Sequence, residues 1–303
     1  MKPVIARKAE NQSLRLFTET SETVAGEVIS AYSTSFGLAT RLLGRRHRAH
    51  IRNIYAMVRV ADEIVDGVAS EAGLTHSQQQ DALQRFTDET HRAMQLGYST
   101  DMVLHAFART AREAGISESL TEPFFASMRA DLRHEQEGPA VFSAEEHASY
   151  VYGSAEVVGL MCVRVFVRDE SLTEHEEAEI ERGARSLGAA FQNINFLRDL
   201  ADDTARLGRS YLGVNGQLTE SDRDRWVAEV RAQLAAADDV IPLLPRDARA
   251  AVRSALMLFA ELTNRVAKTP TAQLYSARIR VPDPVKLSLA IRAVTTTALE
   301  GKR

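Results

Sequence analysis

Two stretches of this chain are predicted helices whose positions are apolar on nearly every side except for one polar stripe. In the first, residues 52–66, polar side chains recur at steps of three and four residues, which places them on one face of a helix. They are Arg52, Tyr55, Arg59, Asp62 and Asp66. A helix that is apolar almost all round is buried, and buried charges must be paired or must coordinate a ligand. The rest of the chain must therefore surround this helix and leave an internal polar site along it.

The second stretch, residues 188–203, repeats this pattern along an equally apolar segment. Its polar stripe consists of Gly188, Gln192, Asn195, Asp199 and Asp203. Both stripes end in Asp-x-x-x-Asp, which presents two carboxylates on one helix face. Hard oxygen ligands suit magnesium, which keeps several waters and bridges to phosphate groups. Two facing carboxylate pairs predict a small magnesium cluster, with manganese as the alternative metal and a diphosphate to complete the coordination.

Other site chemistries agree less well with the sequence. An isolated Asp-x-x-x-Asp is common on solvated helix faces, so the inference depends on finding two of them on apolar helices. A di-metal carboxylate bundle usually has Glu-x-x-His pairs on facing helices, and neither of these stretches contains one. The sequence also lacks a Gly-x-x-x-x-Gly-Lys loop, a His-Glu-x-x-His zinc motif and a Gly-x-Ser-x-Gly elbow.

The remainder of the chain predicts an all-α protein, because only 16 glycines and 8 prolines occur in 303 residues and no hairpin signals separate the segments. Residues 1–20 are predicted to be a loose arm, and residues 45–48 a solvated basic connector. Helices are expected over residues 21–43, 52–66, 76–97, 100–115, 118–135, 143–167, 173–203, 220–237, 246–267 and 284–299. No linker rich in Gly, Ser or Pro divides the chain, which predicts one domain over residues 1–303.

Charge and cysteine content limit the partners and the compartment. A net charge of -4 gives no indication of a nucleic-acid partner. The single cysteine, Cys162, excludes an internal disulfide and is typical of a reducing compartment. Residues 1–15 lack the apolar run of a signal peptide, and Glu156 and Arg164 interrupt the most apolar stretch. We therefore expect a soluble, cytoplasmic protein.

Taken together, the motifs resemble those of the squalene/phytoene synthase family, the head-to-head prenyl diphosphate synthases, and within it most of all the bacterial phytoene synthases. The similarity covers roughly residues 26–295. It depends on Tyr32-Ser-Thr-Ser-Phe36, Ile54-Tyr-Ala-x-x-Arg-x-x-Asp-Glu-x-x-Asp66, Tyr150 with Val157-Val-Gly-Leu-Met161, Gln192-x-x-Asn-x-Leu-Arg-Asp199 with Asp203, and Arg209-Ser-Tyr-Leu212.

This resemblance implies the isoprenoid-synthase fold, with helices around a deep apolar cavity and the two aspartate motifs at its mouth. It implies that Asp62, Asp66, Asp199 and Asp203 hold magnesium and the diphosphates, and that Tyr150 assists proton loss in the first half-reaction. The residues that it places around the substrates are Ser33, Ser35, Phe36, Tyr55, Arg59, Gln192, Asn195, Arg198, Arg209 and Tyr211.

The implied reaction condenses two geranylgeranyl diphosphates to phytoene through a cyclopropyl diphosphate, in carotenoid biosynthesis and without NADPH. One alternative is a synthase that uses farnesyl diphosphate and makes dehydrosqualene or squalene, because the sequence does not locate the cavity floor that sets chain length. Another is a non-catalytic isoprenoid-binding relative, in which the retained aspartates would have no purpose. A monomer is the family default, and the insolubility of the product leaves peripheral contact with the inner membrane face open.

Three departures from the family pattern concern how phosphate is held and how the flap after the second motif closes. Thr34 occupies a position where the family often has a basic residue. Glu156 interrupts a run of small residues. The segment between Asp203 and Arg209 is one residue longer than usual, and Gly213 replaces the usual proline.

Overall fold

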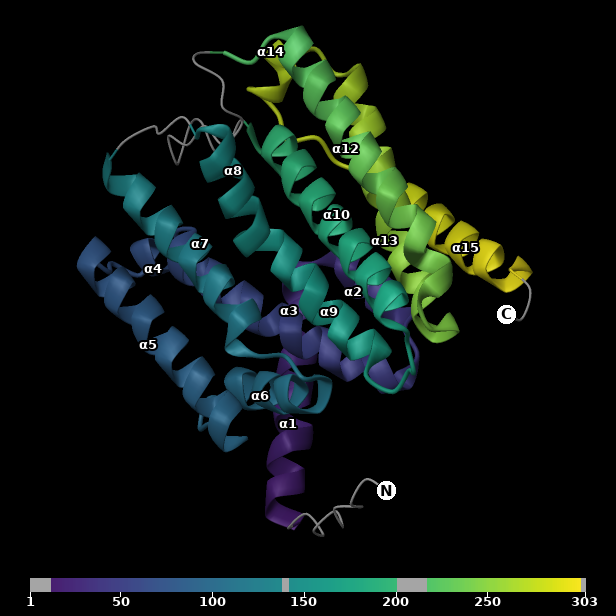
Figure 1. The fold of residues 1–303 in the computed structure, drawn as a ribbon. Coiled ribbons are helices and arrows are strands. Elements are labelled where there is room, and N and C mark those ends of the chain that lie inside the picture. Colours follow the sequence, from purple (N-terminus) through teal and green to yellow (C-terminus); the bar gives the residue numbers. More distant parts are fainter. Residues whose placement is uncertain (1–11, 138–141, 201–216, 301–303) are drawn as a thin grey trace.

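The computed structural model describes residues 12–137, 142–200 and 217–300, and these ranges contain helices and no strand (Figure 1). The all-α prediction is therefore confirmed. The α-helices are α1 (Gln12–Tyr32), α2 (Thr34–Arg41), α3 (Arg45–Val65), α4 (Val68–Glu71), α5 (His76–Leu96), α6 (Met102–Ala114), α7 (Glu118–Glu137), α8 (Ala144–Val151), α9 (Val157–Val167), α10 (Glu174–Arg198), α12 (Glu220–Val240), α13 (Arg246–Lys268), α14 (Thr271–Leu274) and α15 (Asp283–Leu299). A π-helical segment, η1 (Tyr152–Glu156), joins α8 to α9, and a 3-10 turn, η3 (Ile241–Leu243), follows α12.

Helix α10 lies in the middle of the molecule, between α9 on one side and α12 and α13 on the other (Figure 1). Helix α3 packs against α1, α6 and α9, and α15 lies on the outer side of α13. The buried apolar side chains form two clusters that meet along α10, since Ile180 belongs to the first and Ile194 to the second. The two helices with polar stripes, α3 and α10, therefore both lie within the packed interior.

The N-terminal segment differs from the prediction. Helix α1 begins at Gln12, so the predicted loose arm is wrong for residues 12–20, while residues 1–11 lie outside the described residues. Thr18 is buried, and its hydroxyl lies 3.0 Å from Nε2 of His105. Phe17 packs edge-on against the same imidazole, with ring centroids 4.9 Å apart. These contacts come from α6, so the weak local pattern of the segment could not reveal them.

The helix predicted over residues 21–43 is divided at Ser33. The backbone of Ser33 is extended, with φ -143° and ψ 102°, and its Oγ accepts a hydrogen bond from the Phe36 N–H at 3.1 Å. This is an N-cap, which ends α1 and begins α2. Serine and threonine favour such caps because their hydroxyls compete with the helical backbone bonds. The break therefore follows from the hydroxyl-rich sequence of residues 33–35.

The basic residues 45–48 form the first turn of α3, so their prediction as a solvated connector is wrong. The Arg46 guanidinium forms ion pairs of 2.9 Å with both Asp247 and Glu170. His47 is fully buried, with Nε2 3.1 Å from Asp247, and burial lowers the pKa of its imidazole. These partners lie more than a hundred residues along the chain, and they fix the start of α3 to the ends of α9 and α13.

Helix α10 ends at Arg198, so the prediction of a continuous helix to Asp203 is wrong at Asp199; residues 201–216 lie outside the described residues. Asp199 has φ -98° and ψ 12°, and its N–H donates to the Asn195 carbonyl at 2.8 Å. Asp66 ends α3 in nearly the same way, with φ -98° and ψ 14°. A carboxylate at the negative end of a helix dipole is destabilised. Both aspartates are therefore placed where a cation would stabilise them.

The small residues of η1 and α9 allow close contact with α10. A Cβ added at Gly188 would lie 2.6 Å from the Ala155 carbonyl oxygen, and one added at Gly159 would lie 2.6 Å from that of Ala184. Real Cβ atoms do not approach backbone oxygen this closely, so both positions require glycine. The π-helical turn η1 lies at this contact, and such turns are frequent at functional sites.

One helical run of the described residues, Ala144–Val167, is long and apolar enough to cross a membrane by length and composition alone. Half of its most apolar window is buried inside the protein, as in the core helix of a globular fold. The two charges that interrupt it both pair with α10: Glu156 with Arg185 at 2.6 Å, and Arg164 with Glu177 at 2.7 Å. The run therefore packs along α10 as part of the helical core.

Candidate functional site

A cavity of about 1000 Å³ lies among α2, α3, α9, α10, α12, α13 and the segment 278–286. Its volume is at the upper end of the range for small-molecule sites. Along α10 its wall extends from Ile180 to Arg198, a distance of about 27 Å at the rise of an α-helix. The deep cavity that the resemblance implied is therefore present, and it is long enough for extended ligands.

Most residues of the two polar stripes face this cavity. The predicted site residues that line it are Ser33, Ser35, Phe36, Tyr55, Arg59, Asp62, Gln192, Asn195 and Arg198. Asp66, Asp199 and Tyr150 are not among the lining residues in the described part of the chain. Asp203, Arg209 and Tyr211 lie outside the described residues. The structure thus brings the first motif, the α2 hydroxyls and the start of the second motif to one cavity.

Asp62 lies in the cavity wall, where its ionised carboxyl group is electrostatically disfavoured. Burial raises the pKa of its carboxyl group well above the usual range, and the negative charges of Asp66 and Asp131 raise it further. Arg59 opposes this shift without cancelling it. Like charges near a poorly solvated carboxyl group are unfavourable unless a cation neutralises them.

Arg59 is held against the wall by two neighbours. Its guanidinium forms an ion pair with Glu63, one helical turn along α3. It also lies 4.6 Å from the ring centroid of Tyr32, in cation–π contact. Its Nε is buried without a hydrogen-bond partner. The side chain can therefore still donate to a ligand in the cavity.

The Asp199 carboxylate is bridged by two arginines that line the cavity. The Nε of Arg198 donates to Oδ1 at 2.9 Å, and the Nε of Arg278 lies 2.8 Å from the same oxygen. Sequence reasoning missed Arg278, which lies in an irregular segment between α14 and α15 where no helical periodicity marks a face. Only the fold brings it to the second aspartate motif.

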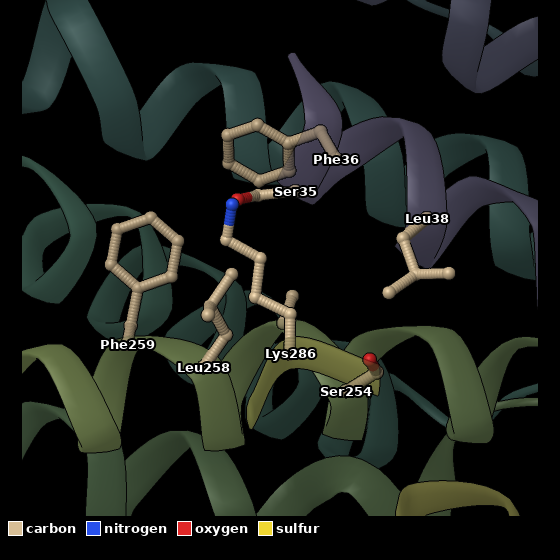
Figure 2. A pocket seen from close by; sticks show the side chains of 8 residues that line it. Ser35, Phe36, Leu38, Ser254, Leu258, Phe259 and Lys286 are labelled. Carbon is tan, nitrogen blue, oxygen red and sulfur yellow. The ribbon is translucent and has the colours of Figure 1, made fainter. Parts of the chain in front are cut away.

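Aromatic rings from several helices form one wall of the cavity. Phe191 of α10 and Phe259 of α13 stack with centroids 3.7 Å apart, and Phe36 of α2 lies 6.0 Å from each of them. Figure 2 shows Phe36 and Phe259 on facing helices at this wall. Tyr55 completes the group at 6.2 Å from Phe36, and burial raises the pKa of its phenol. Such rings can stabilise a positive charge through their faces.

Tyr150 lies on α8, outside the lining of the cavity. Its hydroxyl donates to the Asp131 carboxylate at 2.9 Å, and Ser127 donates to its carbonyl oxygen at 3.1 Å. The ring packs against Phe142 and Phe196 and is 9% exposed. Asp131, to which the sequence gave no role, is almost fully buried. Tyr150 is thus coupled to a carboxylate that also influences Asp62.

The other end of the cavity is apolar. It is lined by Phe166 of α9, Ile180 and Ala184 of α10, Ile241 of η3, and Leu244. Because these side chains come from segments far apart in the sequence, no local pattern marks them as one surface. They form the cavity floor that the sequence could not locate.

A model of the squalene/phytoene synthase family matches residues 29–285. The chain belongs to this family. It is 29% identical over 280 residues to the chloroplastic phytoene synthase 3 of Zea mays, a match that covers 86% of this chain and 62% of that protein. It is 30% identical over 193 residues to a phytoene synthase of Pseudescherichia vulneris, covering 62% of this chain and 58% of that protein. The chain thus spans about half the length of the curated relatives it matches.

Solved structures confirm the isoprenoid-synthase fold of this squalene/phytoene synthase family member. A crystal structure of a ligand-bound dehydrosqualene synthase aligns with a TM-score of 0.74 at 22% identity, covering 93% of this chain and 98% of that one. A squalene synthase from Alicyclobacillus acidocaldarius aligns with a TM-score of 0.69 at 17% identity, covering 84% and 97% respectively. At these identities the likeness concerns the fold alone.

A metal cluster at the polar end would need several oxygen ligands close together. Within the described residues no three acidic, histidine or cysteine side chains gather closely enough to hold a metal ion, and Asp203 lies outside them. Two observations nevertheless agree with a cation at the polar end. The half-buried carboxyl of Asp62 is close to like charges, and the buried Oδ1 of Asn195, on the same cavity, has no hydrogen-bond partner. Both are oxygen ligands of the kind that magnesium prefers.

Proposed function

We propose that this protein is a magnesium-dependent prenyltransferase that joins two geranylgeranyl diphosphates head to head and forms phytoene through a cyclopropyl diphosphate. The observation that carries this proposal is the long cavity itself, which has Asp62 and several arginines at one end and apolar side chains at the other. The phytoene synthase names of the curated relatives support the product. Farnesyl diphosphate as substrate, with dehydrosqualene or squalene as product, is the alternative within the same family.

In this proposal the polar end binds the diphosphates. Asp62, Asp66, Asp199 and Asp203 would hold magnesium, or manganese in its place. The metal neutralises the charge that develops on the departing diphosphate. Arginines at the same end, namely Arg59, Arg198 and Arg278, would donate to its oxygens. In the structure these arginines pair with carboxylates, Arg59 with Glu63 and the other two with Asp199. With a diphosphate bound, their guanidinium groups would donate to its oxygens, which would leave the Asp199 carboxylate free to hold magnesium.

The remaining walls protect the reactive cation. The apolar lining excludes water, which would otherwise trap the allylic carbocation as an alcohol. The faces of Phe36, Phe191 and Phe259 stabilise positive charge without offering a nucleophile. Tyr150 and Asp131 offer a path for the departing proton, since the phenol oxygen can accept it while its own proton passes to the carboxylate. This proton loss completes the first half-reaction, which gives the cyclopropyl diphosphate. A second proton loss, after the second ionisation, ends the reaction as a polyene, so we propose no NADPH requirement.

The test is a product assay on the purified protein. We expect incubation with geranylgeranyl diphosphate and magnesium to give phytoene, identified by chromatography and mass spectrometry of the extracted hydrocarbon. Chelation of the metal should stop the reaction, and NADPH should not change the product. If the protein instead forms squalene from farnesyl diphosphate and NADPH, the alternative substrate is correct and the proposed one is wrong. Release of no hydrocarbon from either substrate would overturn the proposal.

The position of the cavity floor predicts a change of substrate length. Replacing Ala184 by phenylalanine fills the apolar end, so we expect kcat/KM for the twenty-carbon diphosphate to fall relative to the fifteen-carbon one. The ratio should shift by about tenfold or more, since even one methylene in an apolar pocket is worth 10-fold or more. Replacing Phe166 by alanine enlarges the same end and should shift the ratio the other way. An unchanged ratio in both variants, with melting curves that show intact folds, would place the floor elsewhere.

A further inference from the structure

Three arginines lie close together where α1, α2 and α3 meet, and we call them the arginine cluster: Arg41, Arg48 and Arg52. Arg48 and Arg52 are one helical turn apart on the same face of α3, and Arg41 is the last residue of α2. Arg52 belongs to the polar stripe predicted from the sequence, but none of the three is among the described residues that line the cavity. The proposed function therefore gives the cluster no role.

Arg48 is fixed against the end of α2. Its Nη2 donates to the carbonyl oxygens of Arg41 and Leu43, each at 2.9 Å. Positive charge is favourable at the C-terminal end of a helix, so this contact holds the guanidinium in place. The Nε of Arg48 is buried and has no hydrogen-bond partner within the described chain. One edge of the guanidinium is therefore anchored, while the other keeps an unused donor.

Arg52 forms neither a hydrogen bond nor an ion pair within the described ranges, and its Nε is buried. A Cβ added at Gly26 would lie 3.6 Å from Nη1 of Arg52, so the guanidinium packs against α1. Burial lowers the pKa of this guanidinium, and the positive charges of Arg48 and Arg41 lower it further. Arg52 is thus a half-buried cation whose charged neighbours have its own sign.

Other arginines of α3 have carboxylate partners that the arginine cluster lacks. Arg46 pairs with Asp247 and Glu170, each at 2.9 Å, and Arg59 pairs with Glu63. In the part of the chain that the structure describes, no carboxylate forms an ion pair with the cluster. Like charges repel, and an anion bound among them removes the repulsion. The cluster therefore has the charge and the unused donors of an anion site.

We propose that the arginine cluster binds a phosphate group outside the cavity, at a site separate from the diphosphates of the reaction. Guanidinium groups donate paired hydrogen bonds to phosphate oxygens, and a phosphate has enough oxygens for several of them. Arg52 would donate through Nε and one Nη, Arg48 through its unused Nε, and the exposed Arg41 would add charge. A dissolved phosphate and the headgroup of an anionic phospholipid share this chemistry, so the experiment has one arm for each.

A purely structural role is the alternative that the experiment must exclude. In that case Arg48 only caps α2, and the aliphatic stem of Arg52 only covers Gly26. Arg52→Met separates the two roles, because it keeps the stem and removes the charged donors. Arg85→Met is the matched control, since it removes the same charge from an exposed position on α5.

The first arm titrates the protein with inorganic phosphate in EDTA, where no metal contributes. Nitrogen–proton correlation spectra follow the Nε–H groups of the arginines, and the signal that Arg52→Lys removes is that of Arg52. We expect the Nε–H signals of Arg48 and Arg52 to shift together with one dissociation constant. Read on the Arg48 signal, Arg52→Met should weaken phosphate binding about tenfold, the effect of losing a charged hydrogen bond. Arg85→Met should bind as the wild type does.

The second arm measures co-sedimentation with vesicles of phosphatidylcholine that contain phosphatidylglycerol, and with vesicles of phosphatidylcholine alone. If the ligand is a headgroup, the wild type should sediment with the anionic vesicles. Each arginine near such a surface contributes to binding, so Arg52→Met should lower the partition coefficient about fivefold, and adding Arg41→Gln should lower it further. Arg85→Met should have a smaller effect.

A loss specific to Arg52→Met in the first arm supports a site for dissolved phosphate, and a specific loss in the second arm alone supports a headgroup site. Two results would overturn the proposal. One is Arg52→Met behaving as the wild type in both arms. The other is an equal loss in Arg52→Met and Arg85→Met, because net charge alone would then explain the binding. Neither arm measures turnover, so the proposal can fail or hold independently of the proposed function.

Discussion

Asp62→Asn is expected to abolish hydrocarbon formation and, at the same time, to make the metal-free protein more stable. The loss should be about 10³-fold or greater, because the variant removes a charged ligand of the leaving-group site. The gain in stability has a separate cause. Burial and the neighbouring charges of Asp66 and Asp131 disfavour the ionised carboxyl of Asp62, as its raised pKa shows. A neutral amide of the same shape removes that repulsion, and each kcal/mol gained raises Tm by roughly 2–4 °C.

The pH dependence of stability gives this prediction a sign. A carboxyl whose pKa is higher in the folded protein than in the unfolded chain binds more protons when folded, so stability falls as pH rises through the window between the two values. In EDTA, the Tm of the wild type should therefore fall as the pH is raised above the ordinary pKa of an aspartate. Over the same pH range the Tm of Asp62→Asn should fall less steeply. Thermal melts across this range check it, and magnesium should reduce the difference by neutralising the carboxylates.

The matched control is Asp81→Asn, which neutralises an exposed aspartate on α5. It should change neither turnover nor Tm measurably. If Asp62→Asn turned over at a near-normal rate, the metal assignment would be wrong. If the Asp62→Asn variant were less stable than the wild type in EDTA, the Asp62 carboxylate would stabilise the metal-free fold, which contradicts the repulsion argued above.

Sequence reasoning reached the parts of this molecule that are encoded by local periodicity. The polar stripe of α3 was predicted from steps of three and four residues, and Tyr55, Arg59 and Asp62 do line the cavity. The helix starts predicted at Ser143 and Thr173 are also confirmed, and in the structure both residues form a capping box. Each of these features depends on neighbours within one or two helical turns, so the sequence contains all the information they need.

The features that were missed depend on contacts between distant segments. His47 lies in a basic run that is typical of a solvated turn. It is nevertheless buried, because Asp247 and Phe166 contact it at the start of α3. Arg278 and Lys286 lie around an irregular, proline-containing connector, where no period assigns a face. The helix break at Asp199 was missed for a related reason: the apolar pattern continues through it, and only the backbone shows that α10 has ended.

Tyr150→Phe is expected to lower the rate of hydrocarbon formation by about 10²- to 10⁴-fold, the usual contribution of a group that transfers a proton in the transition state. The phenylalanine ring retains the packing against Phe142 and Phe196, so the loss is confined to the hydroxyl. Removing that donor from the buried Asp131 should cost about 1–3 kcal/mol of stability, which a thermal melt measures. Because the block lies in the first half-reaction, the prenyl diphosphate should remain unconsumed and no cyclopropyl diphosphate should accumulate.

The hydrogen bond between Tyr150 and Asp131 makes two companion variants decisive. Tyr152→Phe, two residues along, keeps the ring that lies 5.3 Å from Arg185 and should retain normal turnover. Asp131→Asn still accepts a hydrogen bond from Tyr150 but can no longer take up its proton. If the pair carries the proton, this variant should lose activity almost as fully as Tyr150→Phe; if Asp131 only orients the phenol, it should lose little. A Tyr150→Phe enzyme within about threefold of the wild type would assign proton removal to another group, because the phenol would then act only through packing.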